Sequence, residues 1–273
     1  MARRTRFVTI AFAAAAALLA AGSAFAMQDI KMATTTSTDN SGLLQYLLPK
    51  FEADCKCKIH YTAVGTGAAL KLGQNGDVDV VLVHARPAED KFVAAGYGVN
   101  RRDVMYNDFV IVGPASDPAG IKGMHDPLAA LKKLHASDAT FVSRGDDSGT
   151  NKKELAYWKA IGVKPGGPHY LAVGQGMGQT LTVAGEKQAY TLSDRATYTT
   201  FAAKTGLEIM VQGDKRLLNP YGVIAVNPKR YPKVNYQGAM AFIEWLTSDK
   251  GQQVIGDYRF KGAQLFHPDY KKR

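Results

Sequence analysis

Apolar and polar positions alternate along the chain in two different rhythms. Residues 78–83 form a continuous apolar run, which is typical of a strand buried on both faces of a sheet. Other stretches carry apolar residues at helical spacing, and the clearest contains Leu43, Leu44, Leu47, Leu48 and Phe51. Because runs of the first kind alternate with stretches of the second, the pattern predicts a doubly wound α/β protein.

The same pattern gives approximate limits for each element. The predicted strands cover residues 29–33, 57–64, 78–83, 106–112, 140–143, 170–173, 188–192, 207–211 and 221–226. The predicted helices cover residues 43–51, 87–95, 128–134, 149–160, 177–184 and 236–247, and two more end near residues 204 and 258. Residues 34–40, rich in hydroxyl side chains, are expected to form a loop.

Two discontinuous domains are expected because the chain is long enough for two cores but has no flexible linker. The chain would cross between them twice, near residues 107–112 and 219–226. Residues 27–108 with 222–273 would form domain I, and residues 109–221 domain II. Loops at the carboxyl ends of strands carry the ligands of open α/β sheets, so two such domains would enclose a cleft lined by those loops.

The N-terminal segment reads as an export signal. Arg3, Arg4 and Arg6 precede an apolar run at residues 7–21, and small residues at 23–26 fit a signal-peptidase site. A membrane anchor is the alternative, but the run is shorter than the roughly 20 residues that a span requires. We expect cleavage near Ala26 and a soluble periplasmic protein, exported by the general secretory or the twin-arginine route.

The charge of the chain bears on its binding partners, and its cysteines bear on whether it contains a disulfide. The formal net charge is +10, yet the basic residues are scattered and form no stripe with aromatic residues, so nucleic acid is not an expected partner. A general attraction for small anions explains the charge better. The only cysteines, Cys55 and Cys57, could be free thiols or a strained disulfide, since their Cα atoms would lie about 6.5 Å apart on a strand.

Three predicted strand-to-helix loops share one chemical character, because each places hydroxyl groups and exposed backbone N–H groups at a helix start. Ordinary helix capping explains any one of them, but not the three together on one cleft. Their candidate ligand-binding residues are Thr35, Thr36, Ser37, Thr38, Thr66, Gly67, Arg144, Ser148, Gly149 and Thr150. A further glycine-rich turn, residues 174–178, is a candidate cleft wall.

Arg144 adds a charge that capping does not need. Its forked guanidinium matches two oxygens of an oxyanion, although an ion pair with Asp146 or Asp147 is the alternative. Hydroxyls, amides and one arginine offer only donors, which suits the proton-free dianions tungstate and molybdate. Phosphate would gain from a carboxylate acceptor, and a carboxylate would repel a proton-free dianion. For tungstate, both aspartates should therefore bond to Arg144 or to backbone.

Catalysis is the competing class of function, as an exported hydrolase or transferase acting on an anionic substrate. Acyl transfer needs a nucleophile beside a base, but no Gly-x-Ser-x-Gly elbow occurs. The histidines lie outside the three loops, and only His84 is expected near the cleft, as a capping or supporting residue. We expect no enzyme activity, no cofactor and no metal site other than the metal centre of the oxyanion itself.

Several motifs together resemble the TupA-type tungstate-binding proteins of ABC importers. They are Ala33-Thr34-Thr35-Thr36-Ser37-Thr38 with Ser41-Gly42-Leu43-Leu44, Val64-Gly65-Thr66-Gly67, residues 76–80, residues 102–114, residues 143–150, residues 188–192 and residues 219–228. This resemblance implies a type II periplasmic-binding-protein fold with a hinged cleft. It also implies delivery of the anion to permease subunits driven by a cytoplasmic ATPase.

Molybdate, phosphate and sulfate compete with tungstate, and only the resemblance separates tungstate from molybdate, which has nearly the same size. The resemblance also assigns the first threonine loop and Arg144 to the oxyanion site. A monomer is expected. The Cys55–Cys57 pair departs from the family pattern without touching the candidate site.

Overall fold

A computed structural model describes residues 29–271 of the chain, so the predicted signal segment lies outside the described residues. The strands are β1 (Asp29–Thr35), β2 (Lys58–Val64), β3 (Val80–Val83), β4 (Gly98–Pro114), β5 (Phe141–Ser143), β6 (Tyr170–Ala172), β7 (Thr191–Asp194), β8 (Leu207–Val211), β9 (Leu218–Val226), β10 (Arg259–Phe260), β11 (Ala263–Gln264) and β12 (His267–Pro268). The helices are α2 (Thr36–Asn40), α3 (Leu43–Cys55), α4 (Thr66–Asn75), α5 (Arg86–Ala94), α6 (Pro127–His135), α7 (Gly149–Ala160), α8 (Met177–Glu186), α9 (Arg195–Thr205), the 3₁₀ turn η1 (Lys215–Leu217), α10 (Tyr236–Leu246) and α11 (Asp249–Asp257).

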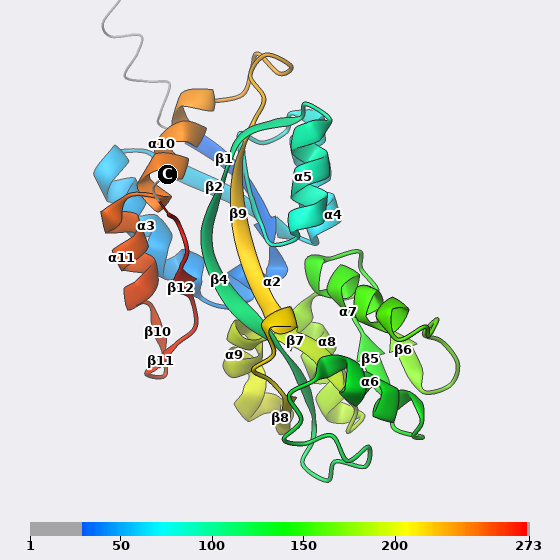
Figure 1. The fold of residues 1–273 in the computed structure, drawn as a ribbon. Coiled ribbons are helices and arrows are strands. Elements are labelled where there is room, and N and C mark those ends of the chain that lie inside the picture. The colour runs from blue at the N-terminus through cyan, green and yellow to red at the C-terminus, as the bar shows by residue number, and fades with distance from the viewer. Residues whose placement is uncertain (1–28, 272–273) are drawn as a thin grey trace, which may run out of the picture.

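Two lobes share one long strand (Figure 1). The first lobe contains β1, β2, β3 and β9 with helices α2 to α5, α10 and α11, and the second contains β5 to β8 with α6 to α9. The main sheet runs in the order β12-β4-β9-β3-β1-β2, while β7 and β8 also pair with β4. β1 is parallel to β2 and β3, whereas β9 is antiparallel to β3 and β4.

β4 changes partners where the lobes meet. Asp108 on β4 pairs with Leu218 on β9, and the next residue, Phe109, pairs with Asp194 on β7. The strand therefore belongs to the sheets of both lobes. β9 runs beside β4 up to this point, so these two strands join the lobes.

Each lobe has apolar layers on both faces of its sheet. In β3, Val80 and Leu82 face one layer while Val81 and Val83 face the other, as the continuous apolar run predicts. In β4, alternate residues also divide: Phe109 and Ile111 enter one layer of the second lobe, and Val110 and Val112 enter the other. These layers cover both faces and fix the strand ends that carry the polar loops.

One sequence prediction about elements is wrong, and the limits of two others differ from the structure. Residues 34–40 do not form a loop, because Thr34 and Thr35 extend β1 and the rest form the short helix α2. The strand predicted at 106–112 is part of the 17-residue β4. The strand predicted at 188–192 starts at Thr191, because Gln188 adopts a positive φ of 49° in the turn after α8.

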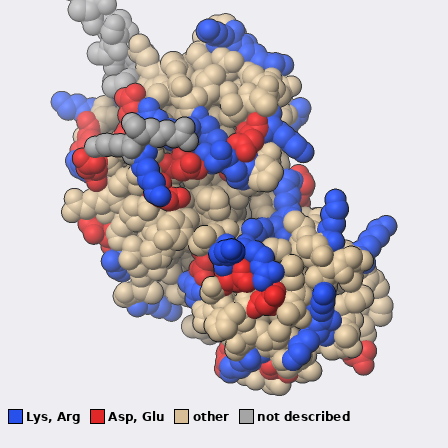
Figure 2. Space-filling view, in the orientation of Figure 1, with Lys and Arg blue, Asp and Glu red and all other residues tan. Residues whose placement is uncertain are grey.

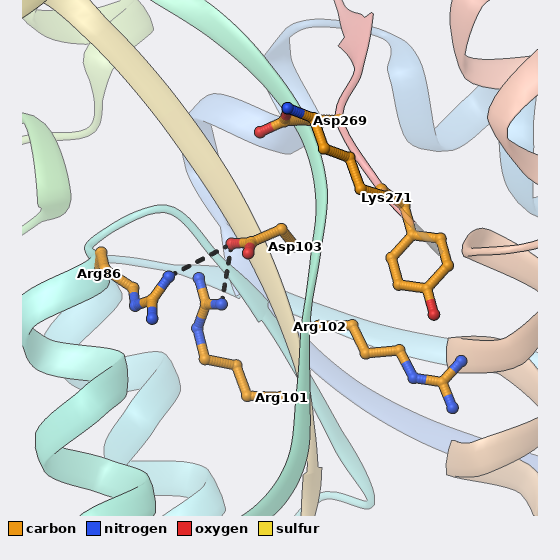
Figure 3. A pocket seen from close by; sticks show the side chains of 7 residues that line it. Arg86, Arg101, Arg102, Asp103, Asp269 and Lys271 are labelled. Carbon is orange, nitrogen blue, oxygen red and sulfur yellow. Dashed lines mark hydrogen bonds and ion pairs between the residues drawn. The ribbon is translucent and has the colours of Figure 1, made fainter. Parts of the chain in front are cut away.

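The charged surface matches the scattered pattern of the sequence. Figure 2 shows Lys and Arg spread over the visible face of both lobes and interspersed with acidic residues, without a continuous basic stripe. A hollow of about 650 Å³ beside β4 and the C-terminal segment is lined by Arg86, Arg101, Arg102, Asp103, Asp269, Tyr270 and Lys271. Arg86 and Arg101 both reach Asp103 there, which offsets part of their positive charge (Figure 3).

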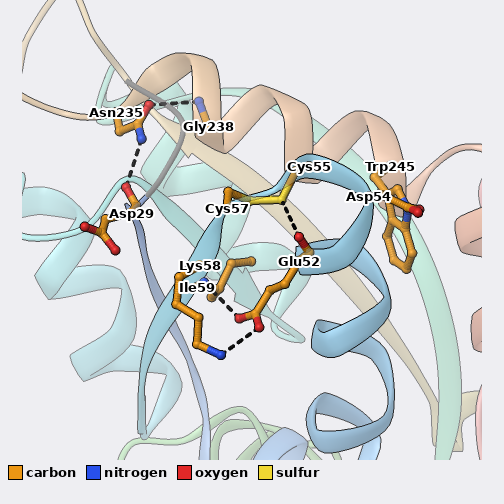
Figure 4. The surroundings of a disulfide bond; sticks show 10 residues. All are labelled: Asp29, Glu52, Asp54, Cys55, Cys57, Lys58, Ile59, Asn235, Gly238 and Trp245. Atoms are coloured by element: carbon orange, nitrogen blue, oxygen red, sulfur yellow. Dashed lines mark hydrogen bonds and ion pairs between the residues drawn. A yellow bond between two sulfur atoms is a disulfide. The ribbon is translucent and has the colours of Figure 1, made fainter. Parts of the chain in front are cut away.

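Cys55 and Cys57 form a disulfide at the joint between α3 and β2 (Figure 4). Their Cα atoms lie 5.2 Å apart, closer than the spacing expected on a strand. The reason is local: Cys55 ends α3, and Lys56 turns the chain with a left-handed φ of 54°. Of the two alternatives that the sequence leaves open, the structure has the disulfide.

Candidate functional site

The first loop comes from the end of β1. Thr35 is extended and caps α2, its hydroxyl accepting a hydrogen bond from the Thr38 amide at 3.2 Å. The hydroxyls of Thr35 and Thr38 also bond to each other at 2.7 Å. Thr35, Ser37 and Thr38 are buried, so this short helix presents a compact set of hydroxyls toward the second lobe.

The second loop starts α4 with Thr66. Gly65 precedes the helix without a side-chain cap, and the Thr66 hydroxyl accepts a hydrogen bond from the Gly149 amide at 3.0 Å. Gly67 lies against the opposite wall: a Cβ added there would come within 3.5 Å of the Asp147 backbone oxygen and would strike that residue's carboxylate. The first lobe thus touches the start of α7 directly.

Arg144 follows β5 and points across the junction. It is 2% exposed, and its Nη atoms donate to Ser37 Oγ at 3.0 Å and to Thr36 Oγ1 at 3.1 Å. The same guanidinium donates to Asp146 Oδ2 at 2.6 Å. Its Nε atom has no hydrogen-bond partner. One arginine of the second lobe is therefore held by hydroxyls of the first.

The start of α7 supplies the other polar groups of this wall. Ser148 caps the helix by accepting from the Asn151 amide at 3.1 Å, and both Gly149 and Thr150 are buried. The glycine-rich turn that precedes α8 closes the side, since a Cβ on Gly176 would lie 3.3 Å from Thr36 Oγ1. The structure thus gathers the loops of Thr35–Thr38, Thr66–Gly67 and Arg144–Thr150 at one junction.

Asp146 bonds to Arg144 and to backbone, as expected for a dianion site, whereas the Asp147 carboxylate pairs with a lysine instead. Asp146 accepts from Arg144 and, through Oδ1, from the Ser148 amide at 3.2 Å. The Asp147 carboxylate is exposed and forms an ion pair with Lys152. Neither carboxylate is left free to face an anion.

His84 supports the threonine loop from the end of β3. Its Nε2 lies 3.1 Å from Thr35 Oγ1, and its Nδ1 lies 3.0 Å from Asn219 Oδ1, while Asn219 donates to Asn107 Oδ1 at 2.7 Å. Burial lowers the pKa of His84 to about 4, opposed by the Asn219 hydrogen bond and assisted by the charge of Arg144. The ring is neutral at pH 7 and connects the loop to both strands that join the lobes.

Asp194 and Tyr221 also lie at this junction, although sequence reasoning did not select them. Asp194 ends β7 and caps α9 by accepting from the Thr197 amide at 2.8 Å. Tyr221 lies on β9, with its phenol near Asn107, Asn219 and Thr38. The signal for Asp194 was available, because it precedes a helix at the end of a strand, as the three selected loops do. Tyr221 carries no comparable local signal.

Unsatisfied polar atoms concentrate at the junction. Within residues 29–271, six buried side-chain nitrogen or oxygen atoms have no hydrogen-bond partner. Five of them belong to Asn107, Arg144, Thr150, Asp194 and Tyr221. Buried polar groups normally find partners, so a polar ligand at this cluster would satisfy atoms that the protein leaves unpaired. Four of the five atoms are nitrogens or hydroxyls that can donate, which suits an anion.

In the described part of the chain, no group of three His, Cys, Asp or Glu side chains could hold a metal ion. Among the same residues, no helix is long and apolar enough to cross a membrane. Of the buried unpaired polar atoms within residues 29–271, most lie at the junction.

Comparison with known proteins identifies the family. The model of the PBP superfamily domain matches residues 20–250 of the chain. The tungstate-binding protein TupA of Peptoclostridium acidaminophilum is 51% identical over 247 residues, which cover 89% of this chain and 86% of the relative.

Solved structures agree. The crystal structure of the tungstate ABC transporter from Geobacter sulfurreducens is 58% identical, with a TM-score of 0.78 over 84% of this chain and 98% of that one. The tungstate-binding protein TupA from Desulfovibrio alaskensis G20 is 49% identical, with a TM-score of 0.76 over 89% and 100%. These matches confirm the predicted α/β periplasmic-binding-protein fold. The chain therefore belongs to the PBP superfamily and, within it, to the family of the TupA proteins.

Proposed function

We propose that this protein captures tungstate between its two lobes in the periplasm and delivers it to an ABC importer. The observation that carries the proposal is the position of Arg144, a buried guanidinium whose Nη atoms reach Ser37 and Thr36 of the opposite lobe. The names of the relatives support the choice of tungstate, since two TupA proteins and a tungstate transporter share about half of their residues with this chain.

The chemistry of the junction supports a proton-free dianion. Hydroxyls, backbone amides and Arg144 supply donors, while the nearby carboxylates of Asp146 and Asp147 already have cationic partners. The ligand-binding residues of this proposal are the ten selected in the sequence: Thr35, Thr36, Ser37, Thr38, Thr66, Gly67, Arg144, Ser148, Gly149 and Thr150. Tungstate is the ligand rather than a cofactor, and we expect no catalytic turnover.

The domain division and the route of the protein belong to the same proposal. Residues 27–108 with 222–273 form domain I and residues 109–221 form domain II, and both move about the strands β4 and β9. The exchange of partners along β4 after Asp108 supports this limit. The signal segment is removed near Ala26, and the mature protein meets the permease subunits as a monomer.

Calorimetric titration of the mature protein with tungstate, molybdate, phosphate and sulfate tests the proposal. Tight one-to-one binding of tungstate, with no response to phosphate or sulfate, is the expected result. The ratio of molybdate to tungstate affinity then measures selectivity between two anions of nearly equal size. A response to phosphate without one to tungstate would overturn the choice of ligand.

Removing the guanidinium should weaken binding strongly. Arg144→Ala should cost on the order of 2–5 kcal/mol of binding free energy, the range for deleting one partner of a buried charged pair. Arg144→Lys keeps the charge without the fork and should recover only part of it. Arg216→Ala is the control, because Arg216 is partly exposed and pairs with Asp126 and Asp214. Unchanged tungstate affinity in Arg144→Ala would remove Arg144 from the site.

A further inference from the structure

Asp194 is a buried carboxyl group with one free oxygen at the junction. The residue is fully buried, and Oδ1 accepts the Thr197 amide that begins the turn of α9. Oδ2 has no hydrogen-bond partner. Capping requires only one carboxyl oxygen, so the second oxygen is available for another role.

The surroundings of Asp194 connect it to the proposed oxyanion site. The charge of Arg144 acts on this carboxyl, and the carboxyl in turn acts on the phenol of Tyr221. Thr197, which Asp194 caps, donates its hydroxyl to the Ser37 backbone oxygen at 3.3 Å. Ser37 is also a partner of Arg144. Asp194 is therefore linked through Thr197 to the same serine that holds Arg144.

The balance of charge at the junction is unfavourable for a dianion if Asp194 is ionised. Arg144 is the cation at its centre and is already paired with Asp146 at 2.6 Å. A bound dianion would add two negative charges to those of Asp146 and Asp194, with a single buried positive charge to offset them. Such repulsion is costly at a site from which water is excluded.

We propose that Asp194 takes up a proton when the dianion binds and thereby acts as a selectivity residue of the site. This inference rests on the proposed function, because it assumes an oxyanion at the junction. As a neutral acid, Asp194 no longer repels a proton-free dianion and can donate a hydrogen bond. As a carboxylate, it would instead favour an oxyanion that carries its own proton, such as hydrogen phosphate.

The electrostatics around Asp194 support this role. Burial raises the pKa of Asp194, although the Thr197 hydrogen bonds and the charge of Arg144 act to lower it. A nearby dianion raises the pKa further. Between the free and bound pKa values, binding takes up one proton. The tungstate affinity should therefore fall as pH rises through that window, by up to about tenfold for each pH unit.

The other charged groups on the packed elements are engaged elsewhere. Arg195 on α9 forms two hydrogen bonds with Asp108 on β4, at 2.7 and 2.6 Å. Asp39 on α2 accepts from Tyr61, and Glu154 on α7 accepts from Trp158. At the junction itself, Asp146 is paired with Arg144, and burial raises the pKa of Tyr221 so that its phenol stays protonated. Burial lowers the pKa of His84, so its ring is neutral and is the competing proton acceptor. The experiment must therefore separate Asp194 from His84.

Proton uptake can be measured by titrating tungstate into the mature protein in buffers of equal pH but different ionisation enthalpy, over a series of pH values. Asp194→Asn is the informative variant, because asparagine caps helices as well as aspartate. Asp126→Asn is its matched control, since Asp126 caps α6 by accepting from the Leu128 and Ala129 amides. His84→Gln tests the competing acceptor. Any protonation of tungstate itself contributes equally to the proton uptake of the parent and of each variant, so it does not affect the difference between them.

We expect Asp194→Asn to lose up to one proton of uptake and to retain tungstate binding with a flatter pH profile. Asp126→Asn and His84→Gln should keep the parent's uptake. Equal uptake in the parent and Asp194→Asn at every pH, or a loss confined to His84→Gln, would overturn the inference while leaving tungstate binding intact. If no oxyanion binds the parent, the proposed function fails first.

A second measurement needs no variant. Infrared difference spectra of the parent labelled with ¹³C-aspartate should show a new carboxylic acid carbonyl band on addition of tungstate. If tungstate does not change the intensity of this carbonyl band at any pH, no aspartate takes up a proton. This outcome would contradict the inference whether or not Asp194→Asn is stable.

Discussion

A single buried carboxyl group, that of Glu154, helps to hold the strand that leads into Arg144 in place. Glu154 on α7 is 2% exposed and accepts from Trp158 Nε1 at 2.9 Å, from Tyr170 Oη at 2.8 Å and from the Ser143 hydroxyl. Ser143 directly precedes Arg144, and Tyr170 lies on the neighbouring strand β6. One carboxyl group therefore ties α7 to the two strands beside the site.

Removing this carboxyl should destabilise the protein. Glu154→Ala leaves several donors buried without an acceptor, which should cost about 2–4 kcal/mol of unfolding free energy. Urea denaturation of the parent and the variant measures the difference. Glu186→Ala, at the exposed end of α8, is the control and should stay close to the parent. An unfolding free energy equal to the parent's in Glu154→Ala would show that these hydrogen bonds contribute no net stability.

At the scale of elements, the sequence predicts best where the signal is local. The limits of α7 and β8 agree with the prediction. The length of β4 could not be predicted, because its first residues include Arg101, Arg102 and Asp103 and are held by pairing with β9. Helix α2 has only five residues and no apolar stripe, so packing rather than helix propensity holds it.

In the candidate site, too, the residues that could be predicted are those with a local sequence signal, and the others are brought there by strand pairing. The hydroxyl loops and Arg144 were predictable, since capping residues and glycines at strand ends are visible in the sequence. Asp194 follows the same rule and was overlooked. Tyr221 and Asn107 were not accessible to such reasoning, because only the pairing of β9 with β4 brings them beside the threonine loop.

The contact between α7 and the first lobe can be tested at one glycine. A Cβ at Gly149 would lie 3.1 Å from the His84 backbone oxygen and 3.2 Å from Thr66 Oγ1. Gly149→Ala should leave the second lobe stable, because alanine favours helix more than glycine does. It should strain the closed contact and weaken tungstate binding by about 1–3 kcal/mol, the usual cost of overpacking.

The matched control for Gly149→Ala is Gly166→Ala, since a Cβ at Gly166 meets nothing within 4 Å. Calorimetric titration and thermal unfolding of both variants separate affinity from stability. Gly149→Ala with the parent's affinity would mean that α7 does not approach His84 and Thr66 in the bound protein.

For the whole molecule, the hydrogen bonds between the lobes determine how far a bound anion can shift the equilibrium between open and closed lobes. Arg144 bonds to Ser37 and Thr36, and the Gly149 amide bonds to Thr66. A typical hydrogen bond contributes about 1 kcal/mol net. These few contacts alone therefore offset little of the conformational entropy that the lobes gain when they separate. A dianion that bonds to both walls supplies a free energy that only the closed arrangement gains, and it should shift the population toward closure.

Small-angle X-ray scattering of the mature protein measures this shift directly. We expect the radius of gyration to decrease on addition of tungstate, because the lobes approach about β4 and β9 while each keeps its own apolar layers. Sulfate at the same concentration controls for ionic effects and should leave the curve unchanged. Gly149→Ala should show a smaller decrease at saturating tungstate, since its added methyl group holds the walls apart. Superimposable curves with and without tungstate would mean that the lobes are already closed before the anion arrives. Selectivity would then rest on the fixed arrangement of donors around Arg144, with no contribution from closure.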